Sequence, residues 1–153
     1  MRDRMNARWF AFLAMVLTGV ALWPQGMPGA SQQDGLFSLV GIRLDELVMR
    51  YGLPQSVHAS RGDEIWQDDV VFVYSEADFY FFQDRVWQIG LRSVYGINIG
   101  DPRAVALLVF GERAQDRGSH ILFPLPAGNW PLALRINISD ERVSGIFVYR
   151  SDF

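Results

Sequence analysis

The stretch VVFVYSEADFYFFQDRVWQIGL, residues 70–91, is decisive for the fold. Its first two apolar runs, 70–74 and 79–82, are rich in β-branched and aromatic side chains and are apolar on both faces. In the third run, 87–91, large apolar residues alternate with small or polar ones, as in a half-exposed strand. The stretch therefore predicts three antiparallel strands, the first two at least partly covered on both faces.

The C-terminal part of the chain carries the same kind of pattern. Residues 132–138 alternate strictly between large apolar side chains and Ala, Arg or Asn, and a turn then leads into a final apolar run, 143–149. Pro124 and Pro126 interrupt the run that begins at Ile121. A proline cannot donate to a strand ladder, so this strand is predicted to be short, bulged or at an edge.

Two short helices are predicted, one before each group of strands. Apolar residues in 44–51 fall at helical spacing on one face, and Gly52 suits the left-handed end of a helix. Residues 102–110 form the second helical pattern, with proline in the first turn and Gly111 as the closing residue.

The two halves match in order and spacing. Gly41-Ile42 and Gly96-Ile97 open the helical patterns, and Asp84-Arg85-Val86 and Glu141-Arg142-Val143 open the last strands, so that matched landmarks lie 55 to 59 residues apart. We expect an α+β domain over 39–153, built of two tandem helix–β–β–β repeats, 39–95 and 96–153. Its short helices should pack on one face of an antiparallel sheet.

The N-terminal segment differs from the rest. Three arginines among the first eight residues precede an uncharged apolar run, 9–23, which is shorter than the roughly 20 residues of a membrane span. Residues 1–30 are predicted to be a signal peptide or an uncleaved N-terminal anchor, and 31–38 a linker. Either alternative predicts export, to the periplasm or the outside, with membrane contact only through an uncleaved segment.

Charge and composition narrow the class of partner. Without residues 1–30 the chain has 11 Arg and 16 acidic residues, hence a net charge of −5. A moderately acidic domain without a basic stripe is a poor ligand for nucleic acid. The chain has no cysteine, which rules out disulfides, a thiolate nucleophile and a lipid-modified N-terminal cysteine.

The segment GIRLDELVMRYGLP, residues 41–54, resembles the helix motif of SmpA/OmlA-type outer-membrane assembly lipoproteins. The strand entry 84–86 resembles that family's later Gly-Arg-Val element, and two such units in tandem are similar to the layout of β-lactamase-inhibitor proteins. Arg43 stands where the family usually has a capping Thr. The resemblance implies a helix-plus-sheet fold whose open sheet face grips another protein.

Chemically reactive groups are sparse. His58 and His120 are the only histidines and share no metal-ligand spacing with acidic residues, and no nucleophile elbow or phosphate loop is present. The acidic cluster 63–69 could bind a cation or simply be a solvated loop. We predict a non-enzymatic protein with no catalytic residue, metal site or cofactor.

The binding residues are predicted from strand parity and aromatic content. Strand parity turns Val86, Gln88, Arg92, Arg135 and Asn137 away from the helices, and Trp87 and Phe147 are assigned to the core. The apolar stripe of the second helix assigns Leu108 to the same core. Tryptophan and tyrosine are common anchors of interfaces. The aromatic candidates are Trp66, Tyr74, Tyr80, Trp87, Trp130 and Tyr149. The predicted partner-binding face is Arg92, Arg135, Gln88, Asn137, Trp66 and Trp130.

The function predicted from these features is an exported, non-enzymatic protein-binding module of the cell envelope. Its partner would be another envelope or secreted protein. The alternative is a binder of a small apolar ligand or lipid, held in a cavity between helices and sheet.

Overall fold

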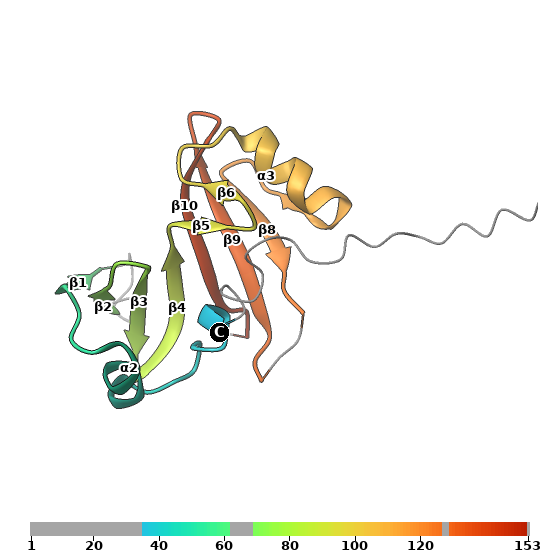
Figure 1. Cartoon of the computed structure of the whole chain (residues 1–153). Coiled ribbons are helices and arrows are strands. Elements are labelled where there is room, and N and C mark those ends of the chain that lie inside the picture. Colours follow the sequence, from blue (N-terminus) through green and yellow to red (C-terminus); the bar gives the residue numbers. More distant parts are fainter. Residues whose placement is uncertain (1–34, 62–68, 127–128, 153) are drawn as a thin grey trace, which may run out of the picture.

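Eight antiparallel strands form one sheet in the computed structural model, which describes residues 35–61, 69–126 and 129–152 (Figure 1). The spatial order is β1-β2-β3-β4-β10-β9-β8-β7. The strands are β1 (Ser56–Ser60), β2 (Asp69–Val73), β3 (Ala77–Phe82), β4 (Arg85–Leu91), β7 (Gln115–Asp116), β8 (His120–Pro124), β9 (Leu132–Ser139) and β10 (Arg142–Arg150).

The remaining elements lie beside this sheet. A two-stranded sheet is made by β5 (Ser93–Val94) and β6 (Ile97–Asn98). The helices are α2 (Leu44–Tyr51), α3 (Arg103–Phe110) and the short 3-10 helix η2 (Gly111–Arg113). Gly52 and Gly111 end α2 and α3 with positive φ, as predicted.

The predicted fold class is wrong, because the chain is richer in β-structure than two helix–β–β–β repeats. Four strands of the eight-stranded sheet follow each helix, and β5 and β6 form a further small sheet. The unpredicted strands lie at the two edges. β1 has the exposed, polar sequence SVHAS and β7 has only two residues, so neither carries an apolar period from which a strand could be predicted.

One row of side chains shows where the core lies. Phe72, Phe79, Ile89, Val148, Leu134 and Phe123 are register partners in turn from β2 to β8 and point to the same face. The Tyr51 ring of α2 lies 6.0 Å from that of Phe79, and the Phe110 ring of α3 lies 4.5 Å from that of Phe123. Both helices therefore cover the same face of the sheet, over its two ends (Figure 1).

A bulge in β4 overturns part of the predicted parity. Tyr80 pairs with Gln88 whereas Phe81 pairs with Val86, which leaves Trp87 as the extra residue. Val86 is consequently fully buried in the core instead of pointing outward. Trp87 instead donates a 2.8 Å hydrogen bond to Asp69, on the face away from the helices.

Two further core predictions were wrong. Phe147 lies on the face away from the helices, because its chain neighbours Ile146 and Val148 point into the core and successive strand residues alternate in direction. Leu108 is 84% exposed, since α3 buries Ala106 and Phe110 on its opposite side.

Each helix is tied to the sheet just before its first turn by the same pair of backbone hydrogen bonds. Gly41 N–H donates to Val86 and Val86 N–H to Ile42 (2.7 and 3.0 Å), while Gly100 N–H donates to Val143 and Val143 N–H to Asp101 (both 2.8 Å). Gly100 makes the contacts that correspond to those of Gly41. The sequence pattern matched Gly41 with Gly96 instead, and that match was wrong. Duplication of the sequence itself stays a prediction.

Gly41 and Gly100 form a matched pair for mutation. Both have φ of +95°, but a Cβ on Gly41 would lie 2.3 Å from Trp130 Nε1, whereas one on Gly100 meets nothing. Gly100→Ala should cost about 1 kcal/mol of unfolding free energy through backbone strain alone. Gly41→Ala should cost at least about 1 kcal/mol more, because the indole must move.

Chemical denaturation followed by tryptophan fluorescence measures both costs. Equal costs for the two variants would show that Trp130 yields freely and does not hold residue 41 in place.

Candidate functional site

The sheet face opposite the helices, called the outer face below, is set by two rows of register partners. One row runs Val71, Tyr80, Gln88, Tyr149, Ala133 from β2 to β9. The other runs Asp78, Gly90, Phe147, Arg135, Leu122 from β3 to β8. Register partners within one row point to the same face. On each shared strand the two rows use residues two apart, so all these side chains lie on one surface.

Two aromatic rings meet at the middle of the outer face. The rings of Tyr80 and Phe147 lie 6.1 Å apart in an edge-to-face arrangement. They converge over Gly90, where an added Cβ would come within 3.4 Å of the Tyr80 ring and 3.6 Å of the Phe147 ring. The missing side chain at residue 90 thus lets rings from β3 and β10 approach across β4.

Both carboxylates of the outer face are engaged by neighbours on the sheet. Asp69 accepts the hydrogen bond from Trp87. Asp78 accepts two hydrogen bonds from Arg92, at 2.8 and 2.6 Å. These hydrogen bonds raise the pKa of the Arg92 guanidinium. Arg92 therefore has its counter-charge within the chain.

Arg135 has no such carboxylate. Its guanidinium carbon lies 5.3 Å from the centre of the Phe147 ring and 5.7 Å from that of Tyr149. Its Nε is buried and has no hydrogen-bond acceptor, and within the part of the chain that the structure describes no ion pair reaches the side chain. The half-buried cation is held by aromatic faces instead.

The structure brings together four of the six predicted binding residues. Arg135 and Asn137 are half-buried on the outer face, and Arg92 lies at its margin. Gln88 is on this face but is only 5% exposed, so its side chain is covered. Trp66 lies outside the described residues. Phe147 lies at the centre of the outer face but was predicted to lie in the core, so it is missing from the predicted binding residues.

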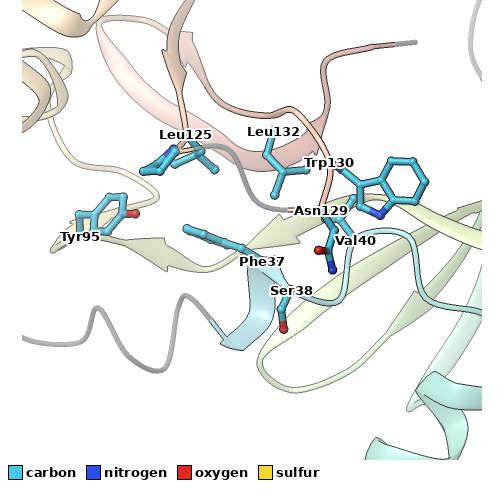
Figure 2. Close-up of a pocket in the computed structure, with 9 residues that line it drawn as sticks. Phe37, Ser38, Val40, Tyr95, Leu125, Asn129, Trp130 and Leu132 are labelled. Carbon is cyan, nitrogen blue, oxygen red and sulfur yellow. The ribbon is translucent and has the colours of Figure 1, made fainter.

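Trp130 lies elsewhere, on the helix side, where it lines a pocket of about 470 Å³ (Figure 2). The pocket wall is mostly apolar and comes from residues 37–40, the segment after β5 and the segment between β8 and β9. It consists of Phe37, Ser38, Val40, Tyr95, Leu125, Pro126, Asn129, Trp130 and Leu132. The Arg150 guanidinium stacks on Trp130 at 3.8 Å and pairs with Asp152.

Neither the histidines nor the acidic residues converge on a metal-like site where the chain is described. Residues 35–61, 69–126 and 129–152 contain no group of three or more His, Asp or Glu placed to hold a metal ion. His58 is on β1 and His120 on β8, near opposite edges of the sheet. Most of the acidic cluster 63–69 falls outside the described residues. The same described ranges hold no helix long and apolar enough to cross a membrane.

Comparison with known proteins gives only distant likenesses. No family model matches the chain, and no curated protein matches it. Among solved structures, an extracellular protein containing an SCP domain from Bacillus anthracis is similar over 76% of this chain, at 11% identity and a TM-score of 0.46. A cysteine-rich secretory protein from Staphylococcus aureus is similar over 75%, at 10% identity and a TM-score of 0.44. The chain spans 46% of the length of each.

The predicted resemblance to SmpA/OmlA-type lipoproteins and to β-lactamase-inhibitor proteins was wrong. The two similar solved structures named above are an SCP-domain protein and a cysteine-rich secretory protein, and no family model matches the chain. The local structure also differs from the expected unit. Arg43 makes no side-chain cap hydrogen bond at the start of α2, and the additional strand β1 follows that helix.

Tyr80 provides a pH test of the outer face. Burial, with Asp78 and Asp69 nearby, raises its pKa above the ordinary value, although Arg92 and Arg135 act in the opposite direction. A folded-state pKa above the unfolded one means that Tyr80 contributes stability fully below about pH 10, and that this contribution is lost as pH rises further. Tyr80→Phe should therefore flatten the fall in melting temperature above pH 10, and an unchanged slope would contradict this burial.

Proposed function

We propose that the chain is an exported, non-enzymatic module that binds a second protein of the cell envelope through its outer face. The supporting observation is the half-buried aromatic centre of that face together with the Arg135 cation, which meets no carboxylate in the described part of the chain. Interfaces are enriched in tyrosine, tryptophan, phenylalanine and arginine, and their strongest contacts come from such residues in well-packed surroundings.

Export is proposed from the sequence. Arginines followed by the apolar run 9–23 have the order of charges and apolar residues found in a secretory signal. The proposal that the module acts by binding also fits the outer face, because Asp69 and Asp78 are both hydrogen-bonded to neighbours there. Both carboxylates help to hold the face itself, with Trp87 and Arg92 as their donors.

Site-specific cross-linking tests the proposed face. A photo-reactive benzoylphenylalanine at Phe147 or Tyr80 should give the same discrete protein adduct in the native envelope, because both rings lie at the centre of the outer face. The control is the same amino acid at Leu108, which is 84% exposed on α3, on the helix side. Adducts that are equal at Leu108, or absent at Phe147 and Tyr80, would contradict the proposal.

A small apolar ligand in the Trp130 pocket is the second candidate function. The pocket supports it, since about 470 Å³ is within the range of small-molecule sites and its wall is mainly aliphatic and aromatic (Figure 2). Ser38 and Asn129 also line the pocket, and their side chains could orient the polar end of a ligand.

Filling the pocket tests this second function. Leu132→Trp should reduce binding of the fluorescent probe 1-anilinonaphthalene-8-sulfonate at least about tenfold, because the larger side chain occupies the space. Leu122→Trp is the matched control, since Leu122 is also half-buried but lies on the outer face. Equal probe binding by both variants and the unaltered chain would rule out the pocket as the site.

A further inference from the structure

We infer that Arg135 is the anchor of the outer face and that it recognises an acidic side chain, Asp or Glu, on the protein partner. The inference rests on the proposed function and makes it more specific. It assigns different roles to two arginines that the sequence treats alike. Arg135 contacts the partner, whereas Arg92 serves the chain's own structure.

The inference is based on the difference between the hydrogen bonds that Arg92 and Arg135 make. A guanidinium has five N–H donors in a planar fork that fits a carboxylate. Arg92 uses its fork on Asp78 with two short hydrogen bonds. The Arg135 fork meets no carboxylate among the described residues, and its Nε is buried without an acceptor. The half-buried side chain leaves its outer nitrogens within reach of a partner, and an incoming carboxylate would supply the counter-charge that the guanidinium lacks among the described residues.

The aromatic surroundings make a carboxylate at Arg135 effective. The ring centres of Phe147 and Tyr149 lie 5.3 and 5.7 Å from the guanidinium carbon. An ion pair beside these rings, at a half-buried side chain, is screened less than one in bulk solvent. The ring contacts also reduce the side-chain freedom that the arginine would lose when the partner binds.

The charge of the whole chain limits the kind of partner. Beyond residue 30 the net charge is −5, so the overall field does not attract an anion. A polyanion such as nucleic acid would be repelled by this net negative charge, which the single cation of Arg135 does not offset. A single acidic side chain within an otherwise neutral or apolar partner surface matches one unpaired arginine among aromatic rings.

Three matched peptides can test the inference on the full chain by NMR. The probes are acetyl-Val-Glu-Val-amide, acetyl-Val-Gln-Val-amide, and the second peptide with a free C-terminal carboxylate. We expect the Glu peptide to shift the Arg135 Nε–Hε signal saturably and to bind at least about tenfold more tightly than either Gln peptide. The Arg92 signal should move far less, because Asp78 holds that side chain.

Two substitutions separate the roles of the arginines. Arg135→Gln should reduce affinity for the Glu peptide about tenfold, to the level of the Gln amide, whereas Arg92→Gln should change it less than about twofold. Melting curves check that both variants are folded. The comparison of the peptides on the unaltered chain tests the inference without any variant. Equal binding of the Glu and Gln amides would overturn the inference. Equal or tighter binding of the free-acid Gln peptide would also do so, because it would indicate a chain terminus as the ligand.

The cross-linking experiment at Phe147 distinguishes the two possible failures. An adduct at Phe147 without any preference for the Glu peptide means that the outer face binds protein but not through a carboxylate. No adduct at Phe147 or Tyr80 means that the proposed function itself is wrong.

Discussion

The pairing of β4 with β10 is the contact on which the rest of the structure depends. Gln88, Ile89, Gly90 and Leu91 face Tyr149, Val148, Phe147 and Ile146 in antiparallel register, and this joins two four-stranded halves into one sheet. The same residues supply both surfaces. Ile89 and Val148 are fully buried on the helix side, while Gly90 and Phe147 lie at the centre of the outer face. A shift of one residue here would exchange the core and the candidate binding surface.

The strength of the local pattern decided how much of the fold could be predicted from the sequence. Long alternating runs such as 132–138 gave correct strands, and Gly52 and Gly111 gave correct helix ends, because these signals depend on a few neighbouring residues. The edge strand β1 could not be found, since it is held by backbone pairing to β2 and carries no apolar alternation. The fold class and the family resemblance failed for a related reason. Short motifs such as 41–54 report a helix followed by a turn, which many folds contain.

The candidate site shows the same limit at the level of single residues. Parity correctly placed Arg135 and Asn137 away from the helices, because the irregularity in this pairing lies on β10, between Val143 and Gly145, and adds no residue to β9. It failed at Val86 and Trp87, since one extra residue in β4 reverses the alternation. No signal within the sequence of β4 marks that bulge. The difference between Arg92 and Arg135 was likewise out of reach, because it depends on Asp78, which comes from another strand.

The separation in sequence of the two central strands also bears on how the chain folds. Hairpins β3–β4 and β9–β10 close over a few residues, but pairing Leu91 with Ile146 brings together residues 55 apart. Closing that large loop costs chain entropy before any contact repays it, which makes such pairing slow compared with hairpin formation. We expect the two hairpins to form early and the central seam late. Phe147 would then meet Tyr80 over Gly90 only at the end of folding, so that the centre of the outer face would be completed last.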